Sequence, residues 1–301
     1  MKPISSRRDL LKLGLAGAAA SVALRPKHAL GVNVDFGSDP KPRPVDADRP
    51  LLAGSKIPIG LELYSVRDQL KTDFIPTIEA VGKMGYAGVE FAGYYDWDKK
   101  PKELRKLLDD NGLKCCGTHT AQQTLEGDNL KRTIELHKIL GNKFLICPSM
   151  QAKTAADWMN LAKKFNEISA KAQEQGMLVG YHSHAGDFKK LDNDKTPWEV
   201  FFDNTDKSVV HQIDIGNTLD GGGDPLAMIK KYPGRTKTTH VKEHGGPKGA
   251  AIGEGTNDWK AFFEAYETVG GTEWYIVEHE TGSDPIKSVK TCLDNLHKMG
   301  K

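Results

Sequence analysis

The chain has 301 residues, 38% of them hydrophobic and 27% charged, which suffices for one large domain or two small ones with a buried core. Of its 42 Lys or Arg and 40 Asp or Glu residues, ten basic and five acidic ones lie in 1–56, which leaves 32 basic and 35 acidic residues beyond. This mildly acidic remainder argues against a nucleic-acid partner.

The first 30 residues have the pattern of an export signal. Arg7 and Arg8 precede an Ala-, Gly- and Leu-rich stretch that is short for a membrane span, and small residues at 21–23 offer a cleavage site. The segment resembles a twin-arginine signal. We therefore expect a periplasmic or otherwise extracytoplasmic protein with no membrane span in its mature domain, and an uncleaved N-terminal anchor is the alternative.

Residues 31–56 are rich in Pro and Asp, with prolines at 40, 42, 44 and 50 that interrupt any helix or strand. This composition predicts a linker. The folded domain is expected at 57–301.

From residue 57 onward, short apolar runs alternate with longer amphipathic ones. The runs predict strands near 57–64, 87–91, 113–118, 143–147, 177–182, 209–215, 236–242 and 274–278. Helical patterns lie near 72–84, 101–111, 126–140, 154–175, 197–204, 224–231, 258–269 and 284–298. Several helices are followed by a glycine, as helix ends prefer: Gly85, Gly112, Gly141, Gly176 and Gly270.

Eight strand and helix pairs match a single-domain (β/α)8 TIM barrel of the α/β class. The competing doubly wound sheet usually has a glycine-rich phosphate loop after its first strand. Residues 62–67 read Glu-Leu-Tyr-Ser-Val-Arg instead. The sequence therefore favours the barrel.

Four successive strands end in a metal-binding type of side chain: His182, Asp214, His240 and Glu278. In a barrel, these strand ends form the active site. Buried carboxylates and imidazoles that lie close together need a cation or partners. Two nitrogen and two carboxylate ligands suit Mn²⁺, Fe²⁺, Co²⁺ or Zn²⁺ better than Ca²⁺. We predict one divalent metal ion at this quartet.

Other polar residues follow the same or the remaining strands. Glu62, Glu90 and His119 are expected to be metal ligands or structural residues, or to line a sugar pocket instead. The aromatic residues Tyr64, Tyr94, Trp97 and Tyr181 are expected either to stack on a sugar or to pack. Packing or surface roles are expected for His137, His211 and His297. The cysteines at 115, 116, 147 and 292 lack metal-like spacing and are expected to be small buried hydrophobic residues.

Taken together, segments 60–67, 85–91, 181–184, 213–214, 240–242, 253–256 and 276–278 resemble the xylose isomerase-like barrels, in the branch named sugar phosphate isomerase/epimerase. This superfamily includes sugar isomerases, epimerases, inosose dehydratases and type IV endonucleases. The resemblance covers about Ile57 to Lys301. It implies metal ligands at Asp214, His240 and Glu278.

The resemblance also exposes a departure. The strand-five ligand is usually Glu in the ketose epimerases, and this chain has His182 there. Their mechanism with two symmetrical glutamates is therefore in doubt here. Asp187 could replace the missing carboxylate, and Glu62 stands where Gln is frequent.

These features predict a metal-dependent sugar isomerase or epimerase that removes a proton next to a carbonyl of an unphosphorylated sugar or keto-sugar. Glu278 is the expected base, and His184, Asp187 or Lys242 the acid partner. Substrate hydroxyls are assigned to Glu62, Tyr64, Glu90, His119 and Glu254.

Two other functions stay open. One is a lyase or hydratase that eliminates from 3-keto-glycosides, or an inosose-type dehydratase. The other is a noncatalytic sugar-binding barrel. A type IV endonuclease would need more metal ligands and a basic groove, which the acidic balance disfavours.

Overall fold

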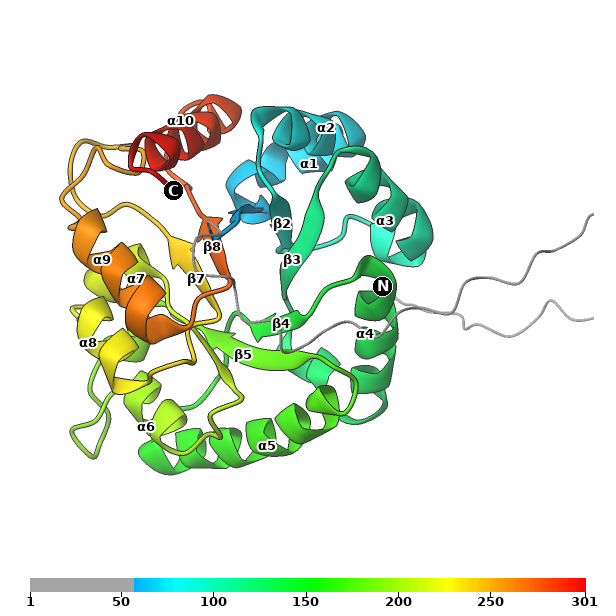
Figure 1. Ribbon diagram of the computed structural model, residues 1–301. Coiled ribbons are helices and arrows are strands. Elements are labelled where there is room, and N and C mark those ends of the chain that lie inside the picture. The colour runs from blue at the N-terminus through cyan, green and yellow to red at the C-terminus, as the bar shows by residue number, and fades with distance from the viewer. Residues whose placement is uncertain (1–56) are drawn as a thin grey trace, which may run out of the picture. The chain divides into compact units, whose positions relative to one another are not determined.

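The computed structural model describes residues 57–301, so the expected export signal and linker lie outside the described range. Eight parallel strands form a nearly closed barrel, and helices surround it (Figure 1). The strands are β1 Ile59–Glu62, β2 Gly88–Phe91, β3 Lys114–His119, β4 Phe144–Cys147, β5 Leu178–His182, β6 Val210–Gln212, β7 Thr238–Val241 and β8 Trp274–Val277. The (β/α)8 prediction is confirmed.

The helices also follow the predicted order. They are α1 Arg67–Thr72, α2 Phe74–Met84, α3 Pro101–Asp110, α4 Gly127–Leu140, α5 Ala155–Gln173, α6 Pro197–Asp203, α7 Ile215–Asp220, α8 Pro225–Lys231, α9 Trp259–Ala265 and α10 Pro285–Lys298. The sequence patterns missed α1 and α7, which are short. A π-helical turn, Tyr266–Gly270, continues α9, so the residue with a left-handed conformation is Gly271 and not Gly270.

The barrel closes between β6 and β7 through few contacts. His211 N–H donates to Arg235 O at 2.9 Å, and His240 N–H donates to Ile213 O at 2.9 Å. An isolated bridge then joins Asp214 to His240. Closure thus brings two predicted metal ligands side by side.

The strand predicted at 209–215 is too long, because β6 ends at Gln212. Asp214 is the N-cap of α7, and its Oδ1 accepts the Asn217 N–H at 2.7 Å. A side-chain oxygen in this position satisfies a free N–H of the first helical turn. The same carboxylate therefore ends the strand and begins a helix.

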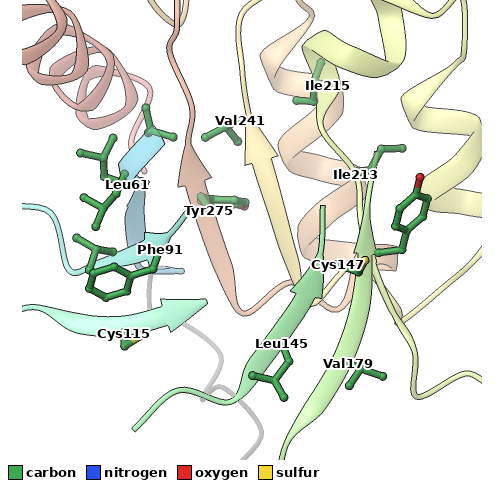
Figure 2. Packing of buried hydrophobic residues seen from close by; sticks show 14 of the residues in the cluster. Leu61, Phe91, Cys115, Leu145, Cys147, Val179, Ile213, Ile215, Val241 and Tyr275 are labelled. Carbon is green, nitrogen blue, oxygen red and sulfur yellow. The ribbon is translucent and has the colours of Figure 1, made fainter. Parts of the chain in front are cut away.

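Alternate residues of each strand point out toward the helices or into the barrel. Figure 2 shows outward residues such as Leu61, Val179 and Tyr275, which belong to one large buried cluster. A small second cluster consists of Phe144, Ile146 and Val210. The outer apolar faces hold the helices in place, which leaves the inward positions at the strand ends for polar side chains.

A bulge in β3 makes room for one of these polar side chains. The strand pairing shifts so that Glu90 lies opposite Gly117. A Cβ at Gly117 would lie 2.0 Å from Glu90 Oε2. The absent side chain therefore allows Glu90 to lie against β3.

The side chain of Arg235 joins α6 to the closing edge of the barrel. Its guanidinium donates to Val209 O at 3.0 Å, Phe202 O at 3.0 Å and Thr205 Oγ1 at 2.7 Å, and the residue is buried. Arg235→Met leaves these acceptors without a donor, so we expect a loss of about 3 kcal/mol in the free energy of unfolding, measured by urea denaturation. Arg105→Met, which removes an exposed ion pair with Asp109, is the control and should leave the midpoint nearly unchanged. Equal midpoints for both variants would contradict the role of Arg235.

The four cysteines and two of the histidines expected in packing roles lie in the buried interior of the domain. All four cysteines are free and buried, as predicted. His211 is buried and accepts the Trp198 Nε1–H at 2.8 Å, and His137 lies 2.7 Å from Tyr94 OH. Both histidines are packing residues.

Within residues 57–301, no helix is both long and apolar enough to span a membrane.

Candidate metal and sugar site

A ring of polar side chains lies at the carboxyl ends of the barrel strands. It consists of Glu62, Glu90, His119, His182, Gln212, Asp214, His240 and Glu278. Glu62, Glu90, Asp214 and His240 have no exposed surface, and Glu278 is 5% exposed. Burying so many ionisable groups is costly unless they neutralise one another or hold a cation.

The four predicted metal ligands lie close together. Each of His182, Asp214, His240 and Glu278 offers one donor atom, and these atoms are all within 4.8 Å of one another. His240 Nδ1 is 2.6 Å from Glu278 Oε2 and 3.7 Å from Asp214 Oδ2. Among the described residues, Asp214 Oδ2 has no hydrogen-bond partner although it is buried. A buried oxygen without a donor fits a site for a cation.

A second set of donors overlaps the first. Glu62, Glu90, His119 and His240 also offer atoms within 4.8 Å of one another. Glu62 lies opposite Glu90 in the pairing of β1 and β2, and Glu62 Oε2 is buried without a partner in the described part of the chain. Burial and the neighbouring carboxylates outweigh the effect of His119 and hold the pKa of Glu62 well above its usual value. The pKa values of Glu62 and Glu90 are thus shifted in opposite directions.

Glu90 and Glu278 are held in the charged state by their neighbours. Burial alone would raise the pKa of Glu278, but His240 and Lys242 outweigh it and hold that pKa well below its usual value. Burial likewise opposes ionisation of Glu90, and His119 and His240 lower its pKa well below the usual value. The pKa of His240 is raised because its carboxylate partners outweigh its desolvation.

Lys242 extends this network toward the mouth of the barrel. Its Nζ donates to Glu278 Oε1 at 3.0 Å, to Asn217 Oδ1 at 3.2 Å and to Glu280. Asp214 and Glu278 raise the pKa of Lys242 above its usual value although burial opposes this. The ammonium group of Lys242 is therefore in contact with Glu278, the residue expected to act as the base.

Asp187 and His184 form a local turn after β5. The Asp187 carboxylate accepts the His184 N–H at 2.7 Å and the Tyr181 O–H at 2.8 Å. Burial raises the pKa of Asp187 to about 6. The exposed His184 has its ring centroid 4.8 Å from that of His182. Asp187 thus orients the turn, and His184 extends the ring of polar groups.

Two of the aromatic residues considered as sugar contacts pack against other aromatic side chains instead. Tyr181 is buried against Trp158, Trp198 and Phe201, so its packing role holds. Trp97 stacks on Phe74 at 5.0 Å. Those aromatic rings are accounted for by packing.

Two predicted substrate contacts are exposed. Tyr64 is 42% exposed and has the Arg67 guanidinium 4.1 Å from its ring centroid. Glu254 is exposed in the segment after β7, where it accepts the Ala251 N–H at 2.9 Å. Both remain accessible to a ligand.

The sequence patterns missed Gln212, Asn217 and Glu280. Gln212 is fully buried at the end of β6 and has polar contacts on every side. Its position two residues before Asp214 was the available signal, because residues two apart on a strand share a face. Glu280 lies two residues after Glu278 and pairs with Lys242.

Comparisons with known proteins agree with this architecture. Residues 78–298 match the family described as xylose isomerase-like TIM barrel. The chain is similar to an inosose dehydratase of Lacticaseibacillus casei, with 26% identity over 71% of this chain and 84% of that protein.

Two solved structures share the fold. One is a sugar phosphate isomerase/epimerase from Parabacteroides distasonis, with a TM-score of 0.71, 22% identity, and coverage of 81% of this chain and 97% of that one. The other is 3-keto-D-glucoside 4-epimerase from E. coli, with a TM-score of 0.61, 15% identity, and coverage of 81% and 100%. Since the family match spans most of the chain, from α2 to α10, the protein belongs to the xylose isomerase-like TIM barrel family.

Proposed function

We propose that the protein is a metal-dependent sugar isomerase or epimerase that acts on an unphosphorylated sugar or keto-sugar. The observation that carries this proposal is the convergence of His182, Asp214, His240 and Glu278, with a buried Asp214 oxygen that lacks a hydrogen-bond donor among the described residues. The donor set fits one ion of Mn²⁺, Fe²⁺, Co²⁺ or Zn²⁺.

When bound, such an ion supplies a Lewis acid that draws electron density from a substrate carbonyl, and so makes the neighbouring proton easier to remove. Glu278 accepts that proton, since it is ionised and lies among the ligands. Lys242, which donates to Glu278, stabilises negative charge that develops on the substrate. Return of the proton to the same or the adjacent carbon gives an epimer or an isomer.

The second candidate is elimination by a lyase or dehydratase. The sequence similarity to an inosose dehydratase favours it, because dehydration also begins with loss of a proton next to a carbonyl. Elimination additionally requires an acid for the departing hydroxyl or glycosidic oxygen. We assign this role to His184, which is exposed and has its ring next to that of His182.

The substrate class follows from the proposed export. Phosphorylated sugars are intracellular metabolites, and no glycine-rich phosphate loop follows β1. Instead, the Glu62 carboxylate accepts the Tyr64 N–H at 3.2 Å there. An exported enzyme of this kind would meet neutral sugars, keto-sugars or glycosides.

The test is proton exchange and product identification. The metal-loaded protein is incubated in deuterated water with aldoses, ketoses, inososes and 3-keto-glycosides, and the sugars are followed by NMR and mass spectrometry. Deuterium next to the carbonyl together with an isomeric product supports the isomerase or epimerase. Loss of water or of an aglycone supports the lyase. Binding of sugars without exchange in any of them would indicate a noncatalytic sugar-binding barrel.

A further inference from the structure

We propose that Glu90 and Gln212 are positioning residues that hold the two histidine ligands with one particular nitrogen facing the metal. The proposal deepens the proposed function and rests on the metal site assigned there. It replaces the expectation that Glu90 binds substrate, since Glu90 has no exposed surface and both its oxygens have partners.

The hydrogen-bond pattern fixes the orientation of the Gln212 amide. Gln212 Nε2 is 2.9 Å from Glu90 Oε2 and 3.3 Å from Glu90 Oε1, and an amide nitrogen can only donate. The amide nitrogen must therefore face Glu90, and it also donates to Thr238 Oγ1 at 2.9 Å. Consequently Gln212 Oε1 faces the opposite side, toward the histidines.

That orientation fixes the protonated nitrogen of His182. His182 Nδ1 lies 3.0 Å from Gln212 Oε1, an amide oxygen that can only accept, so Nδ1 carries the proton. The lone pair of the neutral ring is then on Nε2. His182 can offer only Nε2 to a metal in this arrangement.

Glu90 acts in the same way on His240. His240 Nε2 lies 2.6 Å from Glu90 Oε1, so it donates to the carboxylate. The other nitrogen, Nδ1, faces Glu278 at 2.6 Å and Asp214 at 3.7 Å, which are the other proposed ligands. A carboxylate that accepts a hydrogen bond from a metal-binding imidazole fixes the tautomer of the imidazole and makes it a stronger metal ligand.

His119 completes this group of contacts. Its Nε2 is 3.2 Å from Gln212 Oε1 and 3.3 Å from Glu90 Oε1, and its ring is nearly parallel to that of His240, with centroids 5.3 Å apart. The pair of Glu90 and Gln212 therefore contacts three imidazoles at once. Because the pair is fully buried, no substrate group is needed to satisfy it.

The test swaps the carboxylate and the amide between positions 90 and 212. Glu90→Gln places an amide donor against the amide of Gln212, and Gln212→Glu places two carboxylates together, so each single variant breaks the pair. The double variant Glu90→Gln with Gln212→Glu has the same composition and restores a donor facing an acceptor. It still leaves an acceptor for His182 and for His240. Gln173→Glu on the exposed side of α5 is the matched control.

The readout is the dissociation constant for Co²⁺ and Zn²⁺ by chelator competition without substrate, together with the visible spectrum of the Co²⁺ protein. We expect each single variant to bind metal about 10- to 100-fold more weakly with an altered spectrum. The exchanged double variant should recover most of the affinity, and the control should match the wild type. Circular dichroism checks that each variant is folded; if a single variant is unfolded, the double variant against the wild type gives the answer.

Three results would overturn the inference. The first is that the single variants lose thermal stability but bind metal as the wild type does. The second is that the double variant binds metal no better than the single variants or, if these do not fold, far more weakly than the wild type. The third is that the wild-type protein binds no metal. A wild type that binds metal through these residues but exchanges no substrate proton would refute only the proposed reaction.

Discussion

Replacing Glu278 with glutamine is expected to abolish turnover while the protein keeps most of its metal. The amide retains an oxygen as a ligand but cannot accept a proton at neutral pH, so a loss of at least about 10³-fold in kcat is expected for the missing base. Glu278 is suited to this test because it contacts both His240 and Lys242. The measurements are single-turnover rate and metal content of the same sample.

The matched control is Glu273→Gln. Glu273 precedes the opposite end of β8 and pairs with Lys143 and Lys237, away from the carboxyl ends of the strands. It should keep full activity, which separates loss of the base from loss of one negative charge. Unchanged turnover in the Glu278 variant would remove this residue as the base. Loss of metal together with turnover would assign it as a ligand only.

Removing the metal with a chelator is expected to abolish turnover and to lower the melting temperature. Without the ion, the carboxylates of Glu90, Asp214 and Glu278 lie in one buried site whose positive partners are His240 and Lys242. A free ion concentration of about 100 times the dissociation constant adds about 2.7 kcal/mol to the free energy of unfolding. This corresponds to a rise of roughly 5–10 °C in the melting temperature of a domain of this size. Scanning calorimetry before and after chelation measures the shift.

The matching control is readdition of the ion. One equivalent of the native metal per chain, identified by elemental analysis, should restore both the activity and the melting temperature. Asp214→Asn should show a smaller response to the metal than the wild type, because it weakens one ligand while it keeps an oxygen that can cap α7. Full activity and an unchanged melting temperature after complete removal of the metal would contradict the metal site.

The barrel and the convergence of the quartet were predictable because both depend on local patterns. Buried parallel strands are continuous apolar runs, and their carboxyl ends lie on one side of the barrel. His182 and Glu278 follow such a run directly, and Asp214 and His240 stand at the ends of two segments that also hold Thr, His or Gln. Their mutual distances within 4.8 Å follow from the closing of β6 on β7 and of β7 on β8.

The direction of individual side chains was harder to predict. Tyr181 and His182 are neighbours on β5, and the preceding residues Leu178, Val179 and Gly180 are apolar on both faces. Such a strand gives no alternation from which to tell which residue points inward. In the structure, Tyr181 packs among outer aromatic rings and donates its O–H to Asp187.

The amino-acid sequence alone determined the number and order of the strands, the longer helices between them and the metal-binding types of residue near the strand ends, because these depend on hydrophobic runs and spacing. Only the tertiary structure decided the partners of each polar group. Glu90 and Gln212 are 122 residues apart, and their contact exists because the barrel closes on itself. Protonation, tautomer and access to a ligand all depend on such long-range contacts, so the three-dimensional structure turns a set of polar residues into a site with defined roles.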